Sequence, residues 1–138
     1  SLTTGKPVAC SSALPGHPAS LANDGRARNP EAFWATDVTQ YPGSAWWQVD
    51  FEKPTKIGRV VVVGFYGDQR HYGFTVEVST DTPHWDLVAD RRDQREPATA
   101  DGYTCVFPAR TARYLRVTQT LNSANTGRHL VEVMAYEK

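Results

Sequence analysis

The stretch YGDQRHYG, residues 66–73, holds the side chains best suited to bind a polar ligand. Asp68, Arg70 and His71 fall within four positions of one another. A guanidinium donates hydrogen bonds in a fixed fork and a carboxylate accepts from two hydroxyls, so the two together could hold neighbouring hydroxyl groups. The same Asp-x-Arg pattern is also that of a simple ion pair in a surface turn, and His71 could be merely solvated.

Two tyrosines could add an aromatic face to such a site. Tyr41 lies in ATDVTQYPGSA, residues 35–45, and Tyr72 ends the Asp-x-Arg stretch. An aromatic ring is the usual platform for the apolar side of a polar ligand. Tyr72 also has the parity of the alternating apolar residues that follow it, so it could instead belong to the core.

A third stretch, LNSANTGRH, residues 121–129, supplies the remaining polar candidates. Asn122, Asn125 and Arg128 could complete a ligand shell with amide and guanidinium groups. Asparagine is equally an ordinary turn residue, so either asparagine could serve the loop alone.

The elements that position these loops are predicted to be strands, because the apolar pattern has a period of two. In SAWWQVDF, we expect Trp47, Val49 and Phe51 to share one face and fill the core. Trp46 points to the other face. We predict that it is a second packing residue, covered by the N-terminal segment.

Six more apolar runs read as strands and turn signals separate them. These runs are residues 57–65, 74–78, 85–88, 103–107, 113–120 and 129–136. Seven to eight short strands predict an all-β fold, an antiparallel β-sandwich. We expect a single helical turn at residues 18–22 and a polar surface loop at residues 90–101.

Composition bounds the class of protein. The length of 138 residues fits one domain, and 15 basic residues cancel 15 acidic ones. We therefore expect no nucleic-acid partner and no membrane insertion. The motifs of the common hydrolases and nucleotide enzymes are missing, and Asp86 and Asp90 lie on an expected outer strand, so we predict no enzyme activity. The abrupt ends suggest a module cut from a longer protein, without a signal peptide or with one removed.

Two cysteines, Cys10 and Cys105, leave two alternatives open. A disulfide between them would close a long loop and suit an exported domain. Two buried free thiols acting as small apolar side chains would serve equally well. Their spacing does not fit a zinc site.

An ordered set of short motifs gives the chain a family resemblance. The set comprises GKPVACSS (5–12), PASLANDG (18–25), FW (33–34), WWQVDF (46–51), FTVEVSTD (74–81) with Trp85, ARYLRV (112–117) and Glu132. This chain resembles the discoidin domain, also called the coagulation factor 5/8 type C domain, and within it family 32 of the carbohydrate-binding modules. The resemblance covers nearly all of residues 1–138 as a single module. It implies a galactose-binding-domain-like jelly roll with ligand loops at one end.

The resemblance also assigns roles to the three stretches. In the modules that this chain resembles, sugar is held by loops that correspond to residues 35–45, 66–73 and 121–129. Trp34 corresponds to a tryptophan that usually packs. The residues implied to bind sugar are Tyr41, Asp68, Arg70, His71, Tyr72, Asn122, Asn125 and Arg128.

A structural calcium ion is implied as well. In the family, the turn that includes Asp24 binds the cation with a carboxylate oxygen, carbonyls around Leu21 and Arg26 add to the shell, and Glu132 completes it. Calcium takes 6–8 hard oxygen ligands, so this donor set is chemically sensible. The chain departs from the pattern at Ala32, where the family usually has a hydroxyl. The alternative is that the turn is a plain Asx-type turn.

The function implied is non-catalytic binding of one or two sugar units of a glycan. Such a module is a monomer tethered to a catalytic domain, and it raises the concentration of a glycoside-active enzyme on its substrate. We expect it to be secreted or at the cell surface. The alternative is a cell-surface or protein-adhesion discoidin domain without sugar specificity. Lipid-binding relatives present apolar spikes that the polar loops here lack.

Overall fold

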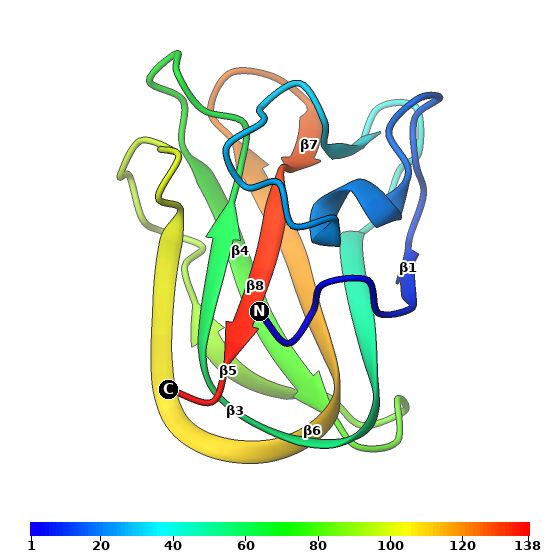
Figure 1. Ribbon diagram of the computed structural model, residues 1–138. Helices are drawn as coiled ribbons and strands as arrows, with labels where there is room; N and C mark the ends of the chain where they lie inside the picture. The colour runs from blue at the N-terminus through cyan, green and yellow to red at the C-terminus, as the bar shows by residue number, and fades with distance from the viewer.

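The computed structural model describes all 138 residues (Figure 1). It contains eight strands and one short 3-10 helix, so the prediction of an all-β fold with seven to eight strands is confirmed. The elements are β1 (Val8–Cys10), η1 (Ala19–Asn23), β2 (Trp34–Asp37), β3 (Ala45–Val63), β4 (Tyr72–Ser79), β5 (Asp86–Asp90), β6 (Tyr103–Asn122), β7 (Gly127–Leu130) and β8 (Glu132–Tyr136). None of its helices is long and apolar enough to cross a membrane.

Two long strands, β3 and β6, run through both layers of the sandwich. Their early and late halves pair in separate stretches, with a register shift between Asp50 and Thr55. The first half of β3 also pairs with β1, and its second half pairs with β8. Both ribbons turn back at the foot of Figure 1. The sequence predicted two strands on either side of Pro54, but the chain bends there without ending, with Glu52 at a φ of 72°.

One layer has the strand order β1-β3-β6-β4-β5, all antiparallel. The other layer is built from the remaining halves of β3 and β6 together with β8. A separate two-stranded ladder, β2 with β7, lies at the end drawn at the top of Figure 1. We call this the apical end. The turns β3–β4 and β6–β7 both lie there.

The core between the layers is apolar and aromatic. Trp47, Val49 and Phe51 are fully buried in it, so the predicted inner face of β3 is confirmed. Trp34 is buried too, as expected of a packing residue, and its indole N–H donates to the Ser12 carbonyl at 3.1 Å.

The cover of Trp46 differs from the prediction. Its half-buried ring lies on the outer face of the sheet, where the guanidinium carbon of Arg116 is 4.1 Å from the ring centroid. The N-terminal segment contacts the Trp46 backbone at Ser11, whose N–H donates to the Trp46 carbonyl and whose side-chain oxygen accepts from the Trp46 N–H. A neighbouring strand therefore covers this ring, and the residue facing it comes from β6.

Both cysteines are free thiols. Cys10 is half-buried on β1 and Cys105 is buried on β6. Of the two alternatives, the structure has the pair of apolar thiols. Burial raises the pKa of each thiol above its ordinary value.

The loop at residues 90–101 is polar, as predicted, but it is tied to the apical end. The Ala98 side chain is buried, and its backbone N–H donates to the Arg70 carbonyl at 2.8 Å. The Tyr103 hydroxyl donates to the Glu96 carbonyl at 2.7 Å. The loop thereby braces the β3–β4 turn from one side.

Candidate functional site

The β3–β4 turn carries a close ion pair between Arg70 and Asp68. Arg70 Nε lies 3.0 Å from each carboxylate oxygen and Nη2 lies 2.6 Å from Oδ2. The pairing holds the pKa of Asp68 below its usual range and raises the pKa of Arg70. The guanidinium carbon also lies 4.9 Å from the centroid of the Phe65 ring. A charged fork and an aromatic face therefore meet at one point of the apical end.

Four rings from four segments of the chain pack together beside the Asp68–Arg70 pair: His17, Phe33, Phe65 and His129. His17 stacks on Phe33 with centroids 4.3 Å apart. Phe33 in turn meets Phe65 at 5.8 Å and His129 at 5.3 Å, both edge to face. All four rings are half-buried, so they are packed together but still reach solvent. We call these four residues, with Asp68 and Arg70, the apical site.

Pairing of β2 with β7 brings these distant residues together. The ladder aligns Ala35 with His129, and Phe33 precedes β2 directly. The Ala35 N–H donates to the His17 carbonyl at 3.3 Å, and Nδ1 of His17 lies 3.0 Å from the Phe33 carbonyl oxygen. Sequence reasoning named neither histidine nor either phenylalanine as a site residue. From sequence, Phe33 belongs to the FW motif and His129 begins an expected strand.

Tyr72 lies beneath the site and does not face solvent. Its ring is 1% exposed, and its hydroxyl lies 2.7 Å from Nδ1 of His129. Burial raises the pKa of Tyr72 to about 12 and lowers that of His129 to about 4. Tyr72 was a candidate for ligand contact. The structure gives it the alternative role, as a core residue that supports the site.

The two asparagines organise the β6–β7 turn. Asn122 is buried and donates to Asn125 Oδ1 at 3.0 Å and to the Gly127 carbonyl at 2.8 Å, while its own oxygen accepts from the Ala124 N–H. Asn125 Oδ1 also accepts from the Gly127 N–H at 2.8 Å. Their placement fits the simpler interpretation as turn residues, because the amide oxygens are committed within the loop.

The other three candidates lie around the site. Tyr41 is 46% exposed on the β2–β3 loop. His71 is half-buried and borders a hollow that Arg95 also lines. Arg128 follows the β6–β7 turn and lines a second hollow. Asp68 contacts Arg70 and Asn122 contacts Asn125, but the eight predicted residues do not form one cluster.

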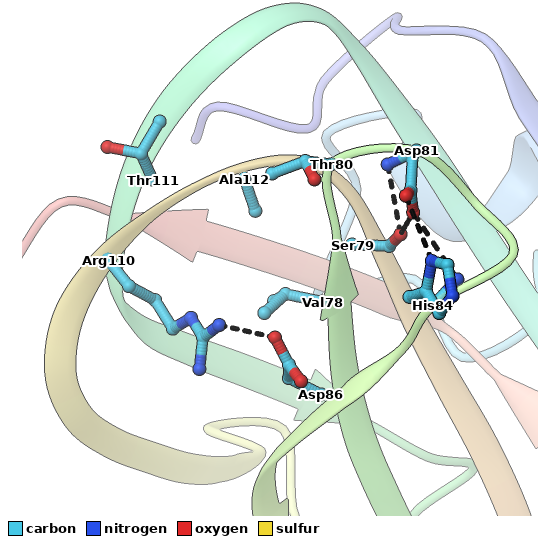
Figure 2. Close-up of a pocket in the computed structure, with 9 residues that line it drawn as sticks. All are labelled: Val78, Ser79, Thr80, Asp81, His84, Asp86, Arg110, Thr111 and Ala112. Carbon is cyan, nitrogen blue, oxygen red and sulfur yellow. Dashed lines mark hydrogen bonds and ion pairs between the residues drawn. The ribbon is translucent and has the colours of Figure 1, made fainter.

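A small, more enclosed hollow lies at the opposite end of the molecule (Figure 2). It holds about 80 Å³ and contains Ser79, Asp81 and His84 in one hydrogen-bonded group. The aspartate lies between the other two, whereas a hydrolase triad needs the histidine in that place. The serine oxygen accepts from the backbone N–H of Asp81 and of Thr82. The group is a capped turn.

The predicted calcium residues Asp24 and Glu132 lie side by side. Glu132 is fully buried, with Oε2 accepting from the Gly25 N–H at 2.9 Å and with Oε1 lacking any partner. Burial, with the neighbouring Asp24 carboxyl, raises the pKa of Glu132 to about 8. Asp24 Oδ1 accepts from the Arg26 N–H at 2.9 Å, the pattern of an Asx-type turn. Leu21 lies in η1 just before that turn.

This donor set fits a hard cation. A buried carboxylate oxygen without a partner is costly, and a cation would satisfy it. No three ionisable side chains gather anywhere as metal ligands, so backbone carbonyls would have to supply most of the shell. Ala32 adds no hydroxyl to it.

Comparison with known proteins agrees with this architecture. Residues 7–133 match the F5/8 type C domain family. The chain belongs to that family. The predicted resemblance is therefore confirmed, and the β-sandwich is that of an F5/8 type C domain.

Solved structures of carbohydrate-binding modules share the fold of this F5/8 type C domain. Chitosan-binding module 1 of a chitosanase/glucanase from Paenibacillus sp. IK-5 is 25% identical, with a TM-score of 0.79 over 98% of this chain and 97% of its own. The CBM32 module of AlyQ, solved with 4,5-unsaturated mannuronic acid, is 23% identical, with a TM-score of 0.81 over 96% and 95%. A family 89 glycoside hydrolase from Clostridium perfringens aligns over 99% of this chain but 14% of its own, with 19% identity and a TM-score of 0.83.

Curated relatives carry the domain within much longer proteins. BTB/POZ domain-containing protein 9 of Drosophila melanogaster is 28% identical over 83% of this chain and 17% of its own length. The protein of the same name from Bos taurus is 31% identical over 71% and 16%. The F5/8 type C domain thus spans about a sixth of these relatives.

Proposed function

We propose that this F5/8 type C domain binds a glycan without catalysing a reaction, and that it does so at the apical site. The observation that carries the proposal is the meeting of the Asp68–Arg70 pair with the ring of Phe65. A pyranose has polar edges and an apolar C–H face, and this arrangement offers a partner to each.

The chemistry of the site suits hydroxyl recognition. The ion pair is fixed before a ligand arrives, so little side-chain entropy is lost on binding. Arg70 is held on one side by Asp68 and packs over Phe65 on the other. The rings of His17 and His129 pack against Phe33 in the same site. One or two sugar units fill such a shallow surface, which predicts weak binding.

The solved neighbours support the same function for this chain. They include modules named for binding chitosan and pectin, and one solved with an unsaturated mannuronic acid. Another neighbour places the domain in one chain with alginate lyase. By analogy, we propose that this domain is extracellular, acts as a monomer and directs an attached enzyme to its polysaccharide.

We also propose a structural calcium ion at Asp24 and Glu132. The unpartnered Glu132 Oε1 is the supporting observation. The ion would tie the loop after η1 to the start of β8. Its role would be to stabilise the fold, since neither carboxylate belongs to the apical site.

The sugar proposal is tested by titration calorimetry of the folded domain. The ligands are galactose, N-acetylgalactosamine, N-acetylglucosamine, fucose, rhamnose and short oligomers of glucosamine and uronic acids. We expect binding to at least one, and a loss of about tenfold or more in Arg70→Ala and in Phe65→Ala. Arg110→Ala, at the opposite end, is the matched control (Figure 2). If the folded wild-type domain binds none of these ligands, the proposal fails.

A cell-surface or protein-adhesion role without sugar specificity is the alternative. A protein partner captured through the apical site, lost in Arg70→Ala and unaffected by competing sugars, would favour this alternative.

A further inference from the structure

Two buried side-chain atoms in the molecule have no hydrogen-bond partner. One is Glu132 Oε1, for which a calcium ion is a sufficient explanation. The other is Nε of Arg128 on β7. A buried N–H without an acceptor costs roughly 1–3 kcal/mol, so an unpaired donor of this kind points to a missing acceptor.

The rest of the Arg128 guanidinium is poorly satisfied too. Nη1 donates to the Gly127 carbonyl at 3.2 Å and Nη2 reaches the Thr120 carbonyl at 3.5 Å. Both acceptors are neutral, and partial burial lowers the pKa of Arg128. This arginine is therefore held in place without any carboxylate to balance its charge.

Asp37, the acidic group whose charge acts on Arg128, already has hydrogen-bond partners. Asp37 Oδ1 accepts from the N–H of Thr39 at 2.8 Å and from its hydroxyl at 2.5 Å. The Thr126 hydroxyl lies 3.1 Å and 3.2 Å from the two carboxylate oxygens. Asp37 thus attracts Arg128 only at a distance and forms no ion pair with it.

Arg128 borders an open hollow of about 480 Å³ beside the apical site. Five of its seven lining residues have polar side chains: Val38, Gly43, Ser44, Thr118, Gln119, Thr120 and Arg128. Arg128 and His129 are neighbours on β7, so their side chains leave the strand on opposite sides. One enters the apical site and the other enters this hollow. β7 therefore lies between the apical site and this hollow, and a glycan held at the apical site would have to extend across the strand to reach the hollow.

We propose that this hollow is a subsite for an oxyanion carried by the glycan, either the carboxylate of a uronic acid or a sulfate ester. The inference rests on the proposed function, since it concerns a further unit of the glycan held at the apical site. Arg128 would bind the oxyanion through its unpaired Nε–H and an adjoining Nη–H. The hydroxyls of Ser44 and Thr120 line the same hollow and would complete the shell.

Calorimetry with matched oligosaccharides tests the subsite. The probes are trigalacturonate, its fully methyl-esterified form, and a sulfated galactan oligosaccharide beside the unsulfated one. We expect the wild-type domain to prefer the acidic member of one pair by about tenfold. Arg128→Gln should remove that preference by lowering affinity for the acidic member. Arg110→Gln, which changes the charge equally at the opposite end, should bind as the wild type does.

The outcomes separate this inference from the proposed function. If the wild type binds the acidic and the neutral oligosaccharide equally, the proposed subsite is wrong. If Arg70→Ala also loses binding to both oligosaccharides, the sugar site at Arg70 is still supported. An acidic preference that survives in Arg128→Gln also overturns the subsite. Absence of binding to every probe by the folded domain overturns both. The Nε–H signal of Arg128 in a nitrogen-proton NMR spectrum gives a second readout, which should shift only with the acidic probe.

Discussion

The phenolic hydroxyl of Tyr72 lies 2.7 Å from Nδ1 of His129, and this contact joins the core of the sandwich to the floor of the apical site. The pKa of Tyr72 is raised to about 12 by burial, so the phenol keeps its proton and donates. The pKa of His129 is lowered to about 4 by burial, then by the charge of Arg70, so the imidazole is neutral and accepts. His129 therefore carries its proton on Nε2.

Removal of that hydroxyl should weaken both the fold and the site. Tyr72→Phe leaves the ring in place and deprives His129 Nδ1 of its donor. We expect a loss of about 1–2 kcal/mol in the free energy of unfolding, measured by urea denaturation. Sugar affinity should fall as well, because His129 is then free to turn. A control is Tyr114→Phe on the outer face of the sheet, for which no hydrogen bond of the hydroxyl is present. Equal stability of the two variants would contradict the role given to Tyr72.

Acid should destabilise the domain through His129. The pKa of this histidine is about 4 in the folded state and about 6.5 in the unfolded chain, so the folded state binds fewer protons. The stability that depends on neutral His129 is complete above about pH 6.5 and is lost as the pH falls toward 4. Urea midpoints measured across this range should fall.

The variant His129→Gln isolates this effect. Its side chain does not titrate, so its urea midpoint should change less between neutral pH and pH 4.5 than that of the wild type. Asp68, whose pKa is lowered by Arg70, adds a loss of stability at more acidic pH in both proteins. Parallel curves for the two proteins would show that His129 is not the group responsible.

The alternating side chains made the sandwich predictable, whereas the apical site was only partly so. Trp47 and Val49 predict the buried face of a strand within one short segment, because apolar residues repeat at every second position along a strand. The strands β1 and β2 are too short for such a period to show. β1 forms because it pairs with β3, and β2 forms because it pairs with β7.

The residues of the apical site are separated along the chain, and nothing local links them. His17 and His129 meet the same Phe33 ring although more than a hundred positions separate the two histidines. Only the pairing of β2 with β7 makes them neighbours. The Asp68–Arg70 pair was found from sequence because its two members are close in the chain. Asn122 was wrongly predictable as a ligand contact from its place in the β6–β7 loop, because its amide makes its hydrogen bonds within the loop, to the Gly127 carbonyl and from the Ala124 N–H.

Calcium should stabilise the domain most at high pH. Without a cation, Glu132 has a pKa of about 8 when folded and an ordinary value when unfolded. The sign is that of a raised acid: the associated stability is complete below the unfolded value and is lost as the pH rises through about 8. We expect the melting temperature in chelator to fall from pH 6 to pH 8.5 and calcium to restore it.

Glu132→Gln supplies the control for the calcium experiment. The amide has the shape of the carboxyl but cannot ionise, so the melting temperature in chelator should no longer depend on pH over this range. Calcium should raise the melting temperature of Glu132→Gln only slightly, because the variant lacks the charged carboxylate ligand. A melting temperature of the wild type that ignores both calcium and chelator would contradict a structural ion.

The two thiols should be unreactive in the folded domain. Cys105 is 2% exposed and burial raises its pKa, so little thiolate forms near neutral pH. Cys10 is half-buried with its pKa also raised. We expect slow labelling of both by a thiol-specific reagent, fast labelling after unfolding, and no change in melting temperature on adding a reductant. A reductant-sensitive melting temperature would indicate a disulfide instead.

Arg116 stabilises the outer face of the β1-β3-β6-β4-β5 sheet by lying between two tryptophans. Its guanidinium carbon is 4.1 Å from the Trp46 ring centroid and 4.3 Å from that of Trp85. Nε and Nη2 both donate to Gln48 Oε1, at 3.1 Å and 2.7 Å. A planar guanidinium stacks on rings and donates in its own plane at once, whereas an ammonium group cannot.

Arg116→Lys should therefore destabilise the domain although the charge is kept. We expect a loss of about 1–2 kcal/mol in the free energy of unfolding and a shift in tryptophan emission as the two rings gain solvent. Arg110→Lys, an exposed arginine of the same strand paired with Asp86, should change stability by less than about 0.5 kcal/mol. Sugar affinity should remain that of the wild type in both variants, because the stacked face and the apical site share no residue. Wild-type stability in Arg116→Lys would mean that the stacking adds nothing beyond a charge on the sheet.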